Sequence, residues 1–372
     1  MNGCCAFSSR TAVPKLRTLS LFLLVWLGIS RPTALAQASQ NNSASGCASC
    51  HAAQSATQSH TPMGQALQFP GSDLALKAHP KLTIQKGDFT YTVETQGDKS
   101  TYSITDGKQT IALPIHWNFG IGMQTWVFER DGQWYEGLVS YYPDIAGLDT
   151  TIGDDVLTPH TVDEAVGRKL LPSEIKDCFN CHATRSSQNG KLTLDSMQAG
   201  VTCEHCHSGS STHMLDALQG DYETAPPKLA KLSSEDLSGF CGQCHRTWDT
   251  VVRNRWRGVV DVRFQPYRLA NSKCFDGTDP RISCLACHDP HKDVVRETSS
   301  YDSKCLVCHA TSTHPSSPQT ISASAKIIGK TCPVAQADCV SCHMPKVTLP
   351  GGHAIFTDHQ IRIVKAGEPF PN

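Results

Sequence analysis

Alternation of apolar and polar residues marks one part of the chain as β-structure. In the run that contains Phe89, Tyr91 and Val93, every second side chain is apolar, which is the period of a strand with one buried face. Short turns at Gly97-Asp98, Asp106-Gly107 and Asp131-Gly132 separate such runs and indicate antiparallel hairpins. The predicted strands are residues 89–94, 101–105, 110–113, 124–129 and 134–142.

The pattern changes after residue 146 to short polar segments with isolated helix starts. One start is Ser233, which precedes two acidic positions and the apolar residues Leu237 and Phe240. Helices this short cannot enclose an ordinary apolar core. We therefore predict an α+β chain: a mostly helical and irregular core with a small antiparallel β-domain inserted. The expected divisions are 1–36, 37–80, a β-rich insert 81–145, and 146–372.

The first 36 residues have the pattern of a secretory signal peptide. Arg10, Lys15 and Arg17 precede an apolar run at 19–29, and Ala34-Leu35-Ala36 follows it. The run is about 11 residues long, against the roughly 20 that span a bilayer, so a retained anchor is the weaker alternative. We expect cleavage after Ala36 and no transmembrane anchor in the mature chain.

Cysteine changes this picture most, because the 372 residues include 18 of them. Fourteen fall in seven copies of C-x-x-C-H, the attachment motif of c-type haem. Two thiols one helical turn apart bond to the haem, and the histidine that follows becomes an axial ligand of its iron. Zinc sites also use C-x-x-C pairs, but they do not require a histidine after every second cysteine.

The sequence therefore predicts seven covalently attached haem c groups. The attachment residues are Cys47, Cys50, Cys178, Cys181, Cys203, Cys206, Cys241, Cys244, Cys284, Cys287, Cys305, Cys308, Cys339 and Cys342. The proximal iron ligands are His51, His182, His207, His245, His288, His309 and His343. Six motifs crowd into residues 178–343, so the porphyrins must supply much of the buried apolar material and the apoprotein should be largely unfolded. The β-rich insert sets the first motif apart in sequence, which makes it the expected entry, exit or subunit-contact haem.

Ten further histidines could supply the second axial ligands. Neutral imidazole binds iron well, and filling both axial positions suits a haem to electron transfer. A histidine a few residues past one motif can reach a neighbouring haem, as expected for His291, which follows the chain-turning Pro290. His205 lies inside a C-x-x-C loop and is left out because it cannot reach the iron of its own motif. The ligands predicted on residues alone are His60, His79, His213, His291 and His314, with at least one from the tail that contains His353 and His359.

Two mature-chain cysteines, Cys274 and Cys332, lie outside the motifs. In an oxidising compartment they can form a disulfide, and two separate thiols are the alternative.

Three stretches resemble a known group of proteins: GVTCEHCHSGSSTH at 200–213, CVSCHMPK at 339–346 and HAIFTDHQI at 353–361. With the β-rich segment 114–143, they are similar to multihaem cytochromes related to the hydroxylamine oxidoreductase superfamily, in the group often fused to tetratricopeptide repeats. The resemblance covers most of the mature chain. It implies that His213, His353 and His359 are distal haem ligands.

The favoured function is electron transfer through mainly bis-histidine haems, in the periplasm or, alternatively, outside the cell or at its surface. One alternative is a multihaem oxidoreductase of small nitrogen or sulfur compounds with one open iron position. Electron transfer is favoured over catalysis because C-x-x-C-K, the variant of the active haem in cytochrome c nitrite reductases, is absent. No catalytic residue is assigned.

A second alternative is a filament in which a histidine of one subunit ligates a haem of the next. The formal net charge of −1 indicates no nucleic-acid partner. The expected partners are redox proteins, and self-association is the hypothesis that accompanies the filament.

Overall fold

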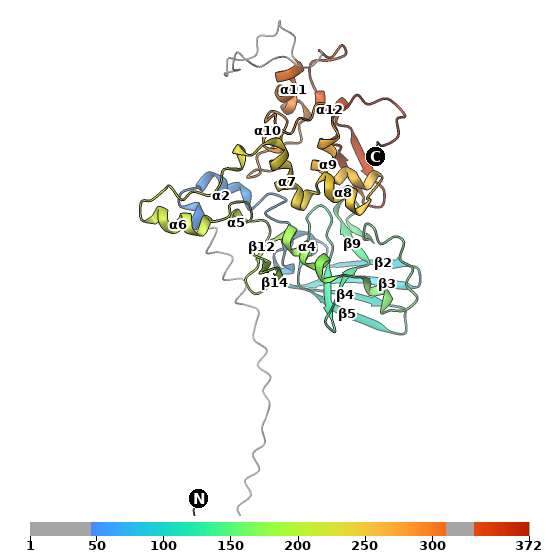
Figure 1. The fold of residues 1–372 in the computed structure, drawn as a ribbon. Helices are drawn as coiled ribbons and strands as arrows, with labels where there is room; N and C mark the ends of the chain where they lie inside the picture. The colour runs from blue at the N-terminus through green and yellow to red at the C-terminus, as the bar shows by residue number, and fades with distance from the viewer. Residues whose placement is uncertain (1–45, 310–330, 372) are drawn as a thin grey trace, which may run out of the picture.

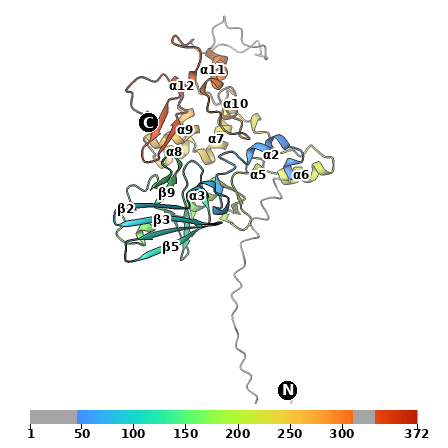
Figure 2. The same cartoon turned by 180° about the vertical axis from the view of Figure 1, so that it is seen from behind.

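The computed structural model describes residues 46–309 and 331–371. The expected signal segment 1–36 and the predicted ligand His314 lie outside the described residues. A β-rich part occupies one end of the molecule, and α11 (Asp302–His309) and α12 (Cys339–His343) lie at the other end (Figure 1). The view from behind shows the same separation (Figure 2). Among the described helices, none is long and apolar enough to cross a membrane.

A four-stranded antiparallel sheet in the order β2-β3-β4-β5 forms the body of the β-rich part. Tyr91, Val93, Tyr102 and Ile104 point to its buried face and are fully shielded from solvent, as the period of two requires. The strands are β2 (Lys81–Lys86), β3 (Phe89–Gln96), β4 (Lys99–Thr105) and β5 (Thr110–Ile115).

Three of the predicted strands appear as β3, β4 and β5, each slightly longer than expected. The predicted strand 134–142 is instead divided at Leu138, because the Leu138 N–H bonds to Val166 O at 3.2 Å and the chain changes pairing partner there. The predicted strand 124–129 begins only at Val127. Three small sheets complete this part: β1 (Leu67–Gln68) with β6 (Asn118–Phe119); β7 (Val127–Arg130), β8 (Gln133–Gly137) and β11 (Gly167–Lys169); and β9 (Val139–Tyr142) with β10 (Gly147–Thr150). Strands therefore continue beyond residue 145, where the sequence places the end of the insert.

Short helices joined by irregular segments make up the rest of the described structure. The predicted start at Ser233 is confirmed, because the Ser233 hydroxyl accepts a bond from Asp236 N at 3.0 Å and caps α7. The helices besides α11 and α12 are α2 (Ala52–Gln58), α3 (Leu74–Ala78), α4 (Pro172–His182), α5 (Cys203–Cys206), α6 (Ser210–Leu218), α7 (Ser234–His245), α8 (Trp248–Asn254), α9 (Gln265–Ala270) and α10 (Cys284–Cys287). Small hairpins follow α4 and α12: β12 (Ala183–Thr184) with β15 (Gln198–Ala199), β13 (Ser187–Gln188) with β14 (Lys191–Leu192), and β16 (Lys346–Leu349) with β17 (Ala354–Thr357).

Buried apolar side chains are concentrated in the β-rich part. One core cluster packs against the four-stranded sheet around Trp126. A second cluster surrounds Phe179 and joins α4 to the β-rich part. Among the described residues past 202, the buried apolar side chains are few: Leu237, Val251, Val262, Tyr267 and Leu349. The described helical part therefore buries little apolar protein surface, and the expectation that porphyrins supply its buried material stays a prediction.

Candidate haem centre

Each of the seven motifs forms one tight backbone turn. In the first motif His51 N bonds to Cys47 O at 2.8 Å. The same bond joins His207 to Cys203 at 2.8 Å and His288 to Cys284 at 2.9 Å, and the other four motifs end or form helices α4, α7, α11 and α12. A turn of this kind brings both thiols and the following imidazole to one side of the backbone, which is the arrangement that covalent haem attachment requires.

Three predicted distal histidines lie beside a proximal histidine. In each pair the distal residue lies just past a different motif or in the C-terminal tail, so the pairs join segments far apart in the chain. The ring centroids are 6.5 Å apart for His51 and His213, 6.1 Å for His207 and His291, and 6.2 Å for His288 and His359.

These separations fit an iron atom between the rings. Imidazole nitrogen binds first-row metals at about 2.0 Å, and about 1.15 Å more separates it from the ring centre, so two opposed rings stand about 6.3 Å apart. Among the described residues, no group of three or more His, Cys, Asp or Glu side chains is arranged to hold a metal. Two protein ligands suffice for haem iron, because the porphyrin supplies the other four.

The second ring nitrogen of several of these histidines is held by the protein. His182 Nδ1 donates to Ala66 O at 2.8 Å and His343 Nδ1 to Arg362 O at 2.9 Å. Among the distal candidates, His359 Nδ1 donates to Thr357 O at 3.0 Å. Such bonds fix the ring and leave Nε2 as the free nitrogen, the usual second-shell arrangement of a metal-binding histidine.

Burial favours the neutral form of four motif or tail imidazoles. Loss of solvent lowers the pKa of His182, His245 and His288. For His359, burial and the neighbouring His288 ring together lower the pKa to about 4. Neutral imidazole is the form that binds iron.

The attachment cysteines of different motifs lie close to one another. Cys181 of the second motif and Cys244 of the fourth are hydrogen-bonded, and Cys181 Sγ also lies 3.8 Å from Gln243 O. Three more contacts of this kind join motifs: Cys47 with Cys203, Cys241 with Cys284, and Cys305 with Cys339. Cys206 lies close to Cys241 and Cys244, and Cys287 lies close to Cys305. The motifs therefore form a connected series of first, third, fourth, fifth, sixth and seventh, with the second beside the fourth.

The first motif is thus set apart only in sequence. Gln58 Nε2 donates to Val201 O at 2.6 Å, and Val201 N donates to Met63 O at 2.9 Å. These bonds tie the segment after the first motif to the segment before the third. The β-rich insert leaves and returns near the same place, so the first motif lies close to the third although the insert separates them in sequence. Its expected role as an entry, exit or subunit-contact haem stays a prediction.

The remaining predicted ligands lie elsewhere. His60 is exposed beyond the end of α2, and the His79 ring packs 5.7 Å from the Tyr141 ring. His353 Nε2 bonds to Asp149 at 2.7 Å, and its ring lies edge-on to Tyr142. The structure brings none of these three rings to a proximal imidazole.

Two cysteines and one histidine outside these sets also have clear positions. Cys274 and Cys332 are both free, as in the alternative of two separate thiols. His205 bonds to the Ala183 backbone beside Cys181. Its place inside a C-x-x-C loop predicts only that it cannot reach the iron of its own motif, whereas the fold places it against the second motif.

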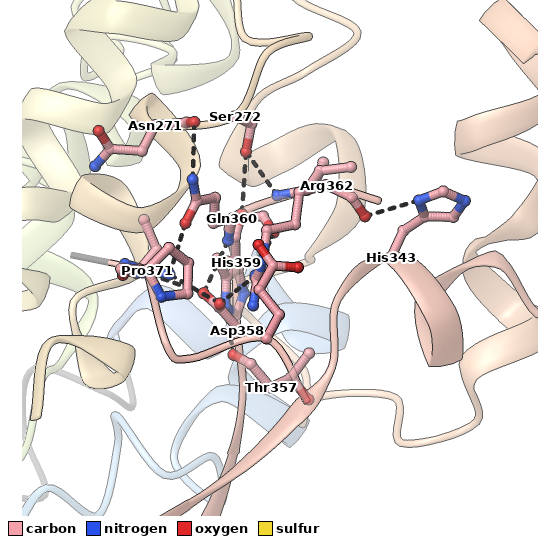
Figure 3. Close-up of polar contacts among 12 residues, drawn as sticks. Asn271, Ser272, His343, Thr357, Asp358, His359, Gln360, Arg362 and Pro371 are labelled. Carbon is pink, nitrogen blue, oxygen red and sulfur yellow. Dashed lines mark hydrogen bonds and ion pairs between the residues drawn. The ribbon is translucent and has the colours of Figure 1, made fainter. Parts of the chain in front are cut away.

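A buried ion pair that no sequence pattern predicts holds the tail that carries His359. Arg268 on α9 and Asp358 are 1% and 0% exposed, and two bonds of 2.8 and 2.9 Å join them. Figure 3 shows Asp358 and Gln360 on either side of His359, with Arg362 beside His343. Because Arg268 and Asp358 are far apart in sequence and lie in unrelated patterns, only the fold reveals the contact.

One family model matches the chain, and it covers residues 159–208, a segment that contains the second and third motifs. Its description is "Cytochrome c554 and c-prime". No curated protein and no solved structure matches the chain. The match and the motif geometry support the class of c-type cytochromes, electron carriers with covalently bound haem.

Proposed function

We propose that this chain is an exported seven-haem cytochrome that passes electrons along mainly bis-histidine haems. The observation that carries the proposal is the set of three opposed imidazole pairs at 6.1 to 6.5 Å. Each pair joins a proximal histidine to a histidine that the sequence predicts as a distal ligand. The likeness to relatives of the hydroxylamine oxidoreductase superfamily stays a prediction. The family model matches residues 159–208 only, and it describes a different family of cytochromes.

In this proposal bound haem supplies a one-electron iron couple, and the protein residues have three roles. The paired imidazoles would both hold the iron, which would leave no position for a small molecule and favour low potentials. Backbone carbonyls fix the ring directions of residues such as His182 and His343. Contacts between attachment turns keep neighbouring sites close, which supports transfer from one end of the series to the other.

Export to the periplasm agrees with the signal-like segment 1–36 and with the attachment chemistry, which is completed outside the cytoplasm. The cell exterior or surface is the alternative location. Redox proteins are the proposed partners. The seven propionate-bearing haems would make the surface more acidic than the formal charge of −1 suggests, so a basic docking face is expected on the partner.

The test is electron paramagnetic resonance of the oxidised protein with and without cyanide, after the haems per chain have been counted by mass spectrometry. We expect seven haems, and low-spin signals that cyanide leaves unchanged. A high-spin, cyanide-binding haem would instead favour the oxidoreductase. Filaments in electron micrographs of the purified protein would favour the polymerising cytochrome.

A further inference from the structure

Segment 358–362 touches the iron-ligand candidates of two different motifs. The His359 ring faces His288 of the fifth motif at 6.2 Å. Arg362, three residues later, is bonded twice to His343 of the seventh motif: Arg362 N donates to His343 O at 3.1 Å, and His343 Nδ1 donates to Arg362 O at 2.9 Å. The position of this short segment therefore sets the direction of two imidazoles (Figure 3).

Arg268 uses four of its five N–H donors, three of them on this segment. Nε and Nη2 form the paired bonds to the Asp358 carboxylate, and Nη2 also donates to Gln360 Oε1 at 2.7 Å. Nη1 donates to Pro371 O at 2.7 Å, and the guanidinium carbon lies 4.3 Å from the centre of the Phe370 ring. A planar fork makes this set of contacts, and a lysine ammonium cannot reproduce it.

Asp358 connects the fork to the backbone of the segment. One carboxylate oxygen accepts a bond from Gln360 N at 3.0 Å, and the other accepts from Arg362 Nη1 at 2.5 Å. Ser272, just after α9, adds a second attachment, because its hydroxyl accepts from Ile361 N at 2.7 Å and donates to His359 O at 3.4 Å. All of these bonds converge on the residues around His359.

Stability alone does not explain a fully buried ion pair. Desolvation of the two charges offsets most of their attraction, and an apolar pair of similar size is often as stable. A buried fork does, however, permit one geometry only, which suits a position where the direction of a neighbouring ring matters.

We propose that Arg268 is a positioning residue that fixes segment 358–362 and thereby directs His359 and His343 at two separate haem sites. The inference rests on the proposed function, because it takes both histidines as iron ligands. It goes beyond that function by assigning the control of two sites to one side chain that touches neither ring.

The test compares Arg268→Lys and Asp358→Asn with the matched control Arg281→Lys. Arg281 forms a comparable pair with Asp279 at 2.6 Å, but it is partly exposed and lies just before the fifth motif. His359→Gly serves as the reference for complete loss of that ligand. Each full-length holoprotein is studied by electron paramagnetic resonance, cyanide binding and potentiometric titration, with the haem content measured first.

We expect Arg268→Lys to keep seven haems while one of the seven becomes partly high-spin and binds cyanide, as in His359→Gly. Free imidazole should restore the low-spin signal in both. The potential of a second haem should rise, because the loosened His343 ring loses the acceptor that makes it a stronger donor to iron. Arg281→Lys should match the unchanged protein.

The inference would be overturned if Arg268→Lys kept the low-spin signals and potentials of the unchanged protein while His359→Gly gave a clear high-spin signal. The proposed function would then stand. A fully low-spin His359→Gly would overturn both the ligand assignment and the inference. If Arg268→Lys and Asp358→Asn yield no holoprotein, Gln360→Ala decides, because it removes one partner of Arg268 and keeps the ion pair. An unshifted potential in Gln360→Ala would then count against the inference.

Discussion

Removal of the Phe179 ring should weaken the packing between the β-rich part and the second motif. Phe179 is fully buried on α4, and its ring lies 5.2 Å from Trp117, 5.1 Å from Phe119 and 6.1 Å from Trp134. Truncation of a buried Phe to Ala costs about 3 to 5 kcal/mol. Each aromatic pair contributes about 0.5 to 1.5 kcal/mol beyond buried area, which places Phe179→Ala in the upper part of that range. Phe179→Leu should cost about 1.5 kcal/mol or less.

Guanidinium unfolding followed by tryptophan emission measures this cost, because bound haem would quench Trp117 and Trp134 in the folded protein. Phe89→Ala is the control: Phe89 is 4% exposed in the other core cluster. Both variants should be less stable than the parent, but only Phe179→Ala should alter the spectrum of one haem, since the Phe119 ring also packs 5.4 Å from His182. A loss below about 1 kcal/mol with an unchanged spectrum would refute the reasoning.

Three further predictions concern single side chains. Burial and the Glu136 carboxylate raise the pKa of Asp154 to about 7. The folded protein therefore holds this proton more tightly than the unfolded chain, so the free energy of unfolding should fall as pH rises from about 4 to 7. Unfolding curves of Asp154→Asn should not show this fall. Asp73 is fully buried, caps α3 and accepts bonds of 2.7 Å from both Asn118 and Gln124. Asp73→Ala should cost about 3 kcal/mol in guanidinium unfolding, from the lost cap and two unpaired amides, and a cost near zero would contradict this. His291→Gly should make one haem high-spin by paramagnetic resonance, whereas His79→Gly, whose ring faces Tyr141, should leave the signals unchanged.

Local features of this chain could be predicted because local rules decide them. Alternation sets β3 to β5, a serine cap begins α7, and the C-x-x-C-H spacing itself requires a turn with the imidazole at its end. The division at Leu138 could not be predicted, because it depends on Val166 as a pairing partner. Strand periodicity contains no information about such a partner.

The residue types of the candidate site could be predicted from the sequence, but the pairing of each distal histidine with a motif could not. Spacing after a motif marks His213 and His291 as ligands for some neighbouring haem, and the fold places them opposite His51 and His207. Which motif each histidine reaches depends on how the chain returns past the β-rich insert. The contact of Arg268 with Asp358 is invisible for the same reason, because the two residues meet only after helix α9 and the tail have docked.

The imidazole pairs also bear on the order in which the protein is assembled. Each would make an iron atom a cross-link that closes a loop, of about 160 residues for His51 with His213 and about 70 to 85 for the other two, so on the scale used for disulfides each closure is worth about 4 to 5 kcal/mol. A chain without haem would lack these closures, so under the proposed export it would cross the membrane unfolded. Haem loading would then be the step that commits the chain to its fold, and a motif skipped early would leave distant segments unjoined.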